Sequence, residues 1–109
     1  MIPSIGSMEN AFSIKGKNVI VTGGNRGIGK GIVTAMAQSG ANVAILARDE
    51  ATSMKAIEEL SSYGGKYRYF KCDVTKVKMA KAAVEEVANE FGTIDVLVNN
   101  AGIARFFNV

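Results

Sequence analysis

The stretch that decides the fold is Thr22-Gly23-Gly24-Asn25-Arg26-Gly27-Ile28-Gly29. It follows the apolar run 18–21 and opens an amphipathic segment, which predicts a strand, a tight turn and a helix. Glycine is needed where a chain turns tightly and where backbone approaches a ligand with no Cβ in the way. Because the first N–H groups of a helix are unpaired and carry the positive end of its dipole, this turn predicts a phosphate-binding site.

Apolar runs and amphipathic segments alternate along the rest of the chain. Strands are expected at 19–22, 42–47, 67–72 and 94–98, with helices at 28–40, 49–63 and 75–91. The strands are apolar on both faces, which is typical of an α/β fold whose parallel sheet carries helices on both sides. Right-handed crossovers favour the strand order third, second, first, fourth. The order reverses between the first and fourth strands, and ligands bind at such a point, outside the carboxyl ends of the strands.

Helical spacing also predicts which side chains face the sheet and where one helix begins. The apolar residues at helical spacing are expected to form one face of each helix, and these sets are Ile28, Ile32, Val33 and Met36, then Met54, Ile57 and Leu60, then Met79, Ala83, Val84, Val87 and Phe91. Thr75 is expected to cap the helix that runs to Phe91, since threonine is a favoured residue at that position.

Composition limits the classes of function that this chain can have. The 109 residues suggest a single domain, with an N-terminal extension at 1–13 and the domain proper at 14–109. There is no histidine and one cysteine, Cys72, which excludes a usual zinc site and an internal disulfide. The net charge is +3, and lysines alternate with glutamates, so no nucleic-acid partner is expected. Without a membrane-length apolar run or a signal-peptide pattern, we expect a cytoplasmic protein with no membrane partner.

Three motifs resemble those of the short-chain dehydrogenase/reductase family. Thr-Gly-x-x-x-Gly-x-Gly spans Thr22 to Gly29, Asp73-Val74 follows the third strand, and Asn99-Asn100-Ala101-Gly102 follows the fourth. The resemblance covers residues 12–103. It implies a Rossmann-type parallel sheet with helices on both faces, here truncated after about four strands. It also implies an oxidoreductase that interconverts a small carbonyl compound and its alcohol by hydride transfer.

The resemblance implies a role for each matching position. The glycines of the first motif shape the pyrophosphate turn, Asp73 accepts from the adenine amine, and Asn100 begins the loop along the ribose near the nicotinamide. Asn99 ties neighbouring strands together, and Asp95 is a structural residue. The expected cofactor-binding residues are Gly23, Asn25, Arg26, Gly27, Ile28, Gly29, Arg48, Asp73, Val74, Asn100, Ala101 and Gly102.

The end of the second strand predicts which nicotinamide cofactor is used. An NAD site places an acid there, about 20 residues past the glycines, to bind the ribose 2′-hydroxyl. This chain has Ala47 followed by Arg48, and Arg26 lies in the glycine turn. A guanidinium binds a 2′-phosphate with two hydrogen bonds, so the two arginines favour NADP. The alternative is that Arg48 is a solvated loop residue, and a one-residue shift of the strand end would put Asp49 at the ribose.

No catalytic residue is assigned. In the family a tyrosine, a lysine four residues later and a serine handle the proton and the carbonyl, and they lie far beyond the Asn-Asn-Ala-Gly loop. The chain ends at Val109 before any matching position, so we expect it to be inactive alone. Tyr67 and Lys71 match the Tyr-x-x-x-Lys spacing, but four residues of a strand span roughly 13 Å. The two side chains therefore cannot share a proton site.

Other readings remain open at this point. One alternative is a non-catalytic nucleotide-binding module, and another is one half of a split or cleaved protein whose complementing C-terminal chain pairs with the open edge of the fourth strand. A methyltransferase of similar layout is disfavoured, because its ribose site needs an acid at the position of Ala47-Arg48. The substrate is expected to be a small molecule, and an intact parent protein is expected to be a homo-oligomer.

Overall fold

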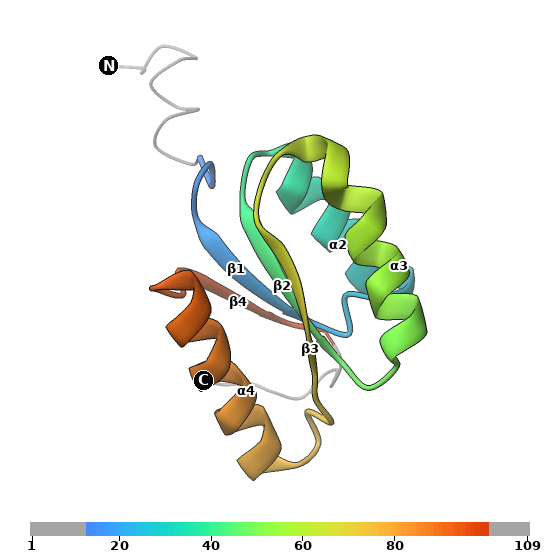
Figure 1. Ribbon diagram of the computed structural model, residues 1–109, viewed down its shortest axis with the longest axis vertical. Helices are drawn as coiled ribbons and strands as arrows, with labels where there is room; N and C mark the ends of the chain where they lie inside the picture. Colours follow the sequence, from blue (N-terminus) through green and yellow to red (C-terminus); the bar gives the residue numbers. More distant parts are fainter. Residues whose placement is uncertain (1–12, 101–109) are drawn as a thin grey trace, which may run out of the picture.

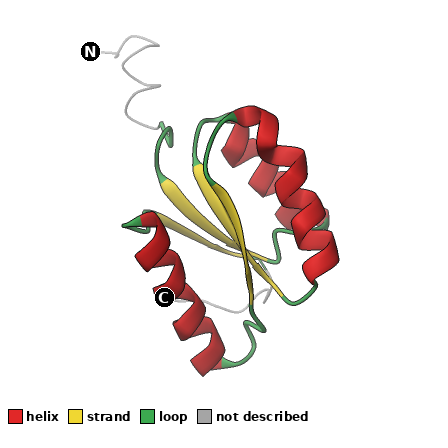
Figure 2. Ribbon diagram, viewed as in Figure 1, coloured by secondary structure: helices red, strands yellow, loops and turns green. Residues whose placement is uncertain are grey.

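The computed structural model describes residues 13–100, which form one parallel four-stranded sheet with helices on both faces (Figures 1 and 2). Strands and helices alternate along the chain. The elements are β1 (Asn18–Thr22), α2 (Gly27–Gln38), β2 (Asn42–Ala47), α3 (Glu50–Leu60), the short 3₁₀ helix η1 (Ser61–Tyr63), β3 (Tyr67–Lys71), α4 (Val77–Phe91) and β4 (Val96–Asn99).

The strand order is β3-β2-β1-β4, and all three pairings are parallel. Val21 of β1 lies opposite Ile45 of β2 on one side and Val98 of β4 on the other. The order and the reversal between β1 and β4 that the sequence predicts are therefore confirmed. The reversal leaves a gap between crossovers at the carboxyl ends of β1 and β4, where ligands bind in sheets of this kind.

Helices α2 and α3 cover one face of the sheet, and α4 covers the other (Figure 1). Because successive strand residues point to opposite faces, Val19 and Val21 of β1 pack under α2 and α3, while Ile20 packs under α4. All three side chains are fully buried. This two-sided burial explains why the strands read as continuous apolar runs.

Three expectations about the inward helix faces are wrong. Ile28, Met54 and Met79 have 79%, 50% and 44% of their surface exposed. Small side chains face the sheet in the two later helices, including Ser53 of α3 and Ala83 of α4. Small residues let a helix axis approach the sheet closely, and the long methionines on the same helices then lie outside the contact.

Thr75 does not cap α4, contrary to expectation. The helix begins at Val77 after Lys76, and no side chain caps it. The Thr75 hydroxyl instead donates to Asp73 Oδ1 at 2.6 Å, and the Thr75 backbone N–H donates to the same oxygen at 3.0 Å. Both bonds end on the Asp73 carboxylate, which is a strong acceptor because it is charged. Thr75 therefore belongs to the turn that follows β3 and does not cap α4.

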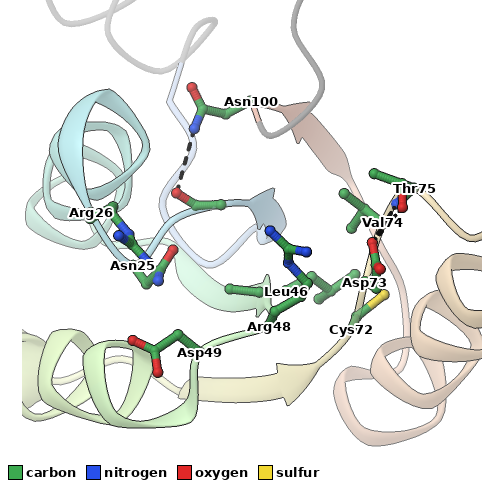
Figure 3. Close-up of a pocket in the computed structure, with 12 residues that line it drawn as sticks. Asn25, Arg26, Leu46, Arg48, Asp49, Cys72, Asp73, Val74, Thr75 and Asn100 are labelled. Atoms are coloured by element: carbon green, nitrogen blue, oxygen red, sulfur yellow. Dashed lines mark hydrogen bonds between the residues drawn. The ribbon is translucent and has the colours of Figure 1, made fainter.

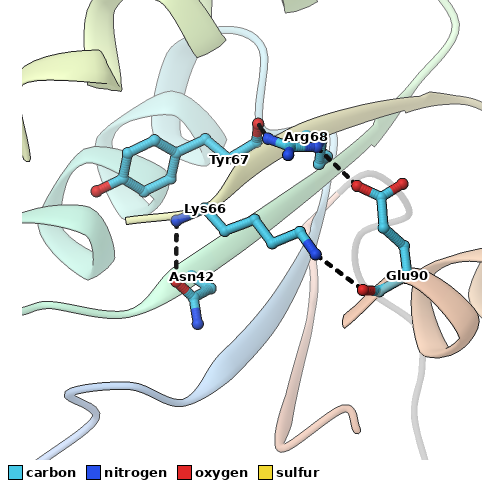
Figure 4. A network of polar contacts seen from close by, with 5 residues as sticks. All are labelled: Asn42, Lys66, Tyr67, Arg68 and Glu90. Carbon is cyan, nitrogen blue, oxygen red and sulfur yellow. Dashed lines mark hydrogen bonds and ion pairs between the residues drawn. The ribbon is translucent and has the colours of Figure 1, made fainter. Parts of the chain in front are cut away.

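Polar side chains join the amino ends of the strands. Asn42 Nδ2 donates to Asn18 Oδ1 at 2.9 Å. Asn42 Oδ1 accepts from the Lys66 backbone N–H at 2.9 Å, as Figure 4 shows. Asn18 in turn donates its backbone N–H to Asp95 Oδ2 at 2.8 Å, and the Asp95 N–H donates to Asn18 O. The structural role predicted for Asp95 is confirmed, and the four strands are tied together at the end opposite the predicted site.

The start of β3 is also tied to the end of α4 (Figure 4). Lys66 Nζ donates to Glu90 O at 2.8 Å, and the Arg68 guanidinium pairs with the Glu90 carboxylate at 2.7 Å. A cation at the last carbonyls of a helix complements its dipole.

Within residues 13–100, no helix is long and apolar enough to cross a membrane.

Candidate functional site

The glycine turn between β1 and α2 forms one wall of the site. Gly27 has φ +59°, a conformation that favours glycine, and a Cβ built there would point into open space. A Cβ on Gly29 would instead collide with the carbonyl oxygen of Gly23 and lie 2.6 Å from Asn100 Nδ2. Gly29 thus lets α2 pack directly on the turn, whose Gly23 N–H is held by Leu46 O of β2 at 2.8 Å.

The N-terminus of α2 is uncapped. No side chain caps it at Arg26, and no acidic residue lies in the first turn. The first bond of the helical type runs from the Lys30 N–H to Arg26 O at 3.1 Å, so the preceding amides have no helical acceptor. The partial positive charge of the helix dipole is therefore not offset by a carboxylate of this helix turn, which suits an anionic ligand.

An open cleft of about 780 Å³ lies at the carboxyl ends of the strands (Figure 3). Its walls come from the glycine turn, the end of β2, the end of β3 and the loop after β4. The lining residues are Gly23, Asn25, Arg26, Leu46, Ala47, Arg48, Asp49, Cys72, Asp73, Val74, Thr75 and Asn100.

Most of the residues predicted to bind a cofactor meet at this cleft. It brings together Gly23, Asn25, Arg26, Arg48, Asp73, Val74 and Asn100. Gly27, Ile28 and Gly29 lie in the adjoining first turn of α2 but do not line it. Ala101 and Gly102 lie outside the described residues.

Sequence reasoning did not single out Leu46, Cys72 or Thr75 as lining residues. Each is next to, or two residues from, a predicted site residue at the end of a strand. The signal that could have found them is position alone, because every parallel strand delivers its last residues to the same edge. Leucine, cysteine and threonine at these positions do not by themselves indicate a binding site.

Two of the residues that line the cleft are arginines. Arg26 and Arg48 are exposed, and neither belongs to the ion pairs formed within residues 13–100, which are Lys30–Glu59 and Arg68–Glu90. Ala47, the last residue of β2, is buried and brings no carboxylate to the strand end. Both guanidinium groups thus keep their donors available for an anion that enters the cleft.

Asp73 is held as a carboxylate on the opposite wall. The hydrogen bonds from Thr75 lower the pKa of the Asp73 carboxyl, and the charge of Arg48 acts in the same direction. Only Oδ1 accepts these bonds, and Oδ2 has no donor among residues 13–100. An ionised carboxylate with one free oxygen can accept a hydrogen bond from an amino group of a ligand.

Asn99 and Asn100 bring the loop after β4 onto the glycine turn. The Thr22 hydroxyl donates to Asn99 Oδ1 at 3.1 Å, and the Asn100 N–H donates to Thr22 Oγ1 at 2.8 Å. The Asn100 amide also reaches Gly23 O at 3.4 Å (Figure 3). The tying role predicted for Asn99 is confirmed, since these bonds join β1 to the residues at the end of β4.

Cys72 and the tyrosines of β3 offer no nucleophile or proton donor to the cleft. Burial raises the pKa of the Cys72 thiol, and the charge of Asp73 adds to this, so the thiol stays protonated at neutral pH. Tyr67 and Lys71 lie on a strand, as predicted. Tyr69 donates its hydroxyl to Ala47 O at 3.0 Å, which leaves that proton in a structural bond.

Comparison with known proteins gives a consistent picture. Residues 17–109 match the family model described as short chain dehydrogenase. The 3-oxoacyl-[acyl-carrier-protein] reductase of Chlamydia muridarum is 48% identical over 90 residues, which are 82% of this chain and 36% of that protein. A probable NADP-dependent mannitol dehydrogenase of Yarrowia lipolytica is 38% identical over 84% of this chain and 33% of that protein.

Solved structures share the fold. A dehydrogenase/reductase from Sinorhizobium meliloti superposes with a TM-score of 0.82 at 34% identity, over 91% of this chain and 40% of that one. An NADH-dependent reductase complexed with NAD superposes with a TM-score of 0.72 at 32% identity, over 79% of this chain and 36% of that one. The chain spans about a third of the length of the curated relatives that it matches. By the match over residues 17–109 and the shared sheet, this chain belongs to the short-chain dehydrogenase family of oxidoreductases.

Proposed function

We propose that this chain is the NADP(H)-binding portion of an oxidoreductase that interconverts a small carbonyl compound and its alcohol. The observation that carries the proposal is the cleft at the strand ends, which adjoins the uncapped start of α2 and is lined by two arginines that form no ion pair within residues 13–100. The nicotinamide supplies the hydride chemistry, and the residues of this chain bind and orient it. Residues 14–109 are then a partial dinucleotide-binding domain.

The residues present fit a dinucleotide. The N–H groups at the start of α2 suit the pyrophosphate, and no acidic residue of the first helical turn opposes it. A Cβ would project from Gly27 into open space, so glycine there keeps the backbone accessible. The cleft volume of about 780 Å³ lies within the usual range for small-molecule sites, about 300–1,000 Å³.

The two ends of the cleft suit different parts of the cofactor. Asp73 and Val74 would hold the adenine, with the free Asp73 oxygen accepting from its amino group. Asn100 would lie beside the ribose near the nicotinamide. The complete proposed binding set is Gly23, Asn25, Arg26, Gly27, Ile28, Gly29, Arg48, Asp73, Val74, Asn100, Ala101 and Gly102.

The arginines support NADP over NAD. The family accommodates both cofactors, since one relative is named as NADP-dependent and one structure as NADH-dependent. In this chain the buried Ala47 replaces the acid that would bind a ribose 2′-hydroxyl, and Arg48 follows it into the cleft. A planar guanidinium binds a phosphate through two parallel hydrogen bonds, whereas a carboxylate would repel it.

Titration with NADPH and NADH tests the proposal. Because the chain has no tryptophan, nucleotide fluorescence can be followed directly on binding. We expect NADPH to bind at least about 10-fold more tightly than NADH, and Arg48→Ala to weaken NADPH by about 10- to 100-fold, as for a lost charge-assisted bond. NADH affinity should change by less than about 3-fold.

Lys81→Ala is the matched control for the arginine variant. It also removes one exposed cation, but from α4 on the other face of the sheet, outside the cleft. Both nucleotides should bind this variant as they bind the unaltered chain. Equal affinity of the unaltered chain for both nucleotides would contradict NADP specificity, and binding of neither would contradict the nucleotide site.

A further inference from the structure

A chain of hydrogen bonds joins the glycine turn to the start of α3. Asn25 Nδ2 donates to Thr52 Oγ1 at 2.7 Å, and Thr52 Oγ1 donates to Asp49 Oδ2 at 2.7 Å. A hydroxyl has one proton, so a Thr52 oxygen that accepts from Asn25 directs its proton to the carboxylate. Asn25 is 7% exposed and has little freedom to seek another partner. The hydrogen bonds therefore run in one direction, from the Asn25 amide through the Thr52 hydroxyl to the Asp49 carboxylate.

This chain of bonds fixes an acid beside the proposed phosphate site. Asp49 lines the cleft and follows Arg48 directly. Figure 3 shows that the two side chains leave the end of β2 in different directions, with Arg48 reaching into the cleft and Asp49 turned toward Asn25 and Arg26. The orientation of this carboxylate decides whether it opposes a 2′-phosphate or leaves it undisturbed, because like charges repel strongly at short range.

We propose that Thr52 is a positioning residue for cofactor choice, whose hydroxyl holds the Asp49 carboxylate on the α3 side of the cleft and so leaves Arg48 available to a 2′-phosphate. The inference rests on the proposed NADP function and deepens it. Thr52 touches no part of the nucleotide; it acts on cofactor choice through Asp49, and it also accepts the hydrogen bond from Asn25. The inference also explains how an acid two residues past the strand end is compatible with an NADP site.

The groups that act on the Asp49 carboxyl come from the glycine turn, the start of α3 and β3. Charged or titratable groups that act on Asp49 or respond to it are Arg26 of the glycine turn and Tyr69 of β3. The hydrogen bond from Thr52 is the largest cause that lowers the pKa of the Asp49 carboxyl, and the charge of Arg26 acts in the same direction. Without the Thr52 hydroxyl, the carboxylate loses the largest of these contributions and keeps only the backbone N–H groups of Thr52 and Ala51 and the charge of Arg26, so it is held less firmly on the α3 side of the cleft.

Four variants of the 109-residue chain test the inference by titration with NADPH and NADH. Thr52→Val removes the hydroxyl at nearly constant volume, and Thr52→Ser keeps it. We expect Thr52→Val to reduce the preference for NADPH by about 10-fold and Thr52→Ser to change it by less than about 2-fold. Adding Asp49→Asn to Thr52→Val should restore the preference, since the released carboxylate is then neutral. Asp49→Asn alone should change the preference by less than about 3-fold, because the carboxylate is already held away.

A second readout needs no nucleotide. In carbon-13 NMR titrations of the free chain, Thr52→Val should raise the pKa of the Asp49 carboxyl toward the ordinary aspartate value of about 3.9. Thr52→Ser should leave this pKa low. If Thr52→Val does not fold, Asp49→Asn alone decides the matter, because a gain in NADPH preference of more than about 10-fold would show that the carboxylate already opposes the phosphate.

The possible failures are distinguishable. If the unaltered chain prefers NADPH but Thr52→Val weakens both nucleotides equally or neither, the role of Thr52 is overturned and the NADP proposal stands. If the unaltered chain binds both nucleotides alike or binds neither, the NADP proposal fails and the role of Thr52 fails with it.

Discussion

At the scale of single residues, two glycines in the same helix have opposite meanings. A Cβ on Gly29 would collide with Gly23 O, whereas a Cβ on Gly31 would meet nothing within 4 Å. Both residues belong to α2 and are two positions apart. The requirement for glycine at position 29 therefore comes from close approach of the helix to the turn and not from the helical conformation.

Alanine substitutions at these two glycines separate the effects. Gly29→Ala should lower the free energy of unfolding by about 1–3 kcal/mol, because the turn must move to admit the methyl group. Gly31→Ala should raise it by about 0.4–1 kcal/mol, since alanine loses less backbone freedom on folding. Urea denaturation followed by circular dichroism measures both. Equal effects of the two substitutions would contradict the packing role of Gly29.

At the scale of elements, the sheet is held differently at its two ends. Asn42 links the starts of β1 and β3 through two hydrogen bonds of 2.9 Å, while the carboxyl ends are joined by Thr22, Asn99 and Asn100. Side chains at the amino end bond only to one another and to backbone. At the carboxyl end Asn100 also lines the cleft, together with the glycine turn and the ends of β2 and β3.

Asn42→Ala tests how much the amino-end network stabilises the sheet. We expect the free energy of unfolding to fall by about 1–3 kcal/mol, because the Lys66 N–H and Asn18 Oδ1 lose their partners in a half-buried setting. Gln38→Ala is the control, since it removes an exposed amide bonded to the Tyr63 hydroxyl and should change stability by less than about 0.5 kcal/mol. Thermal unfolding compares the two, and a loss no larger for Asn42→Ala than for Gln38→Ala would refute the role of the network.

The elements themselves were predictable, but their contacts were less so. The bounds of β2 match the prediction from its apolar run, and β1, β3 and β4 differ by one or two residues at their ends. The spacing of apolar residues and the composition of a segment indicate which faces of a strand are buried. They do not report how closely a helix approaches the sheet, which is why Met54 and Met79 are exposed against expectation. They also do not show that Thr75 bonds to Asp73 in place of capping α4.

At the scale of the whole molecule, the cleft gathers segments that are distant in the sequence. The glycine turn, the end of β2, the end of β3 and Asn100 all contribute to its walls. A ligand that bridges these segments binds the folded chain and not the unfolded one, so its binding free energy adds to the stability of the entire sheet.

Nucleotide binding should therefore stabilise the chain against global unfolding. At about 100 times its Kd, NADPH should raise the free energy of unfolding by about 2.7 kcal/mol. The same concentration should stabilise Arg48→Ala much less, because its Kd is higher. Urea midpoints with and without nucleotide measure the effect. A midpoint that NADPH does not move, at a concentration where fluorescence shows saturation, would place the bound nucleotide elsewhere than on the native fold.

The residue pattern was enough to predict the order of the elements, the parallel sheet with its reversal between β1 and β4, and the glycine turn. These features depend on periodicity, on the chirality of crossovers and on backbone conformations that glycine allows, all of which are local or general. The residue pattern did not predict that Arg48 enters the cleft while Asp49 bonds to Thr52, or that Asn25 reaches across to α3; these contacts appear once the chain is folded. The physical reason is that a side chain's direction at a strand end is set by hydrogen-bond partners from other segments, which no local pattern encodes.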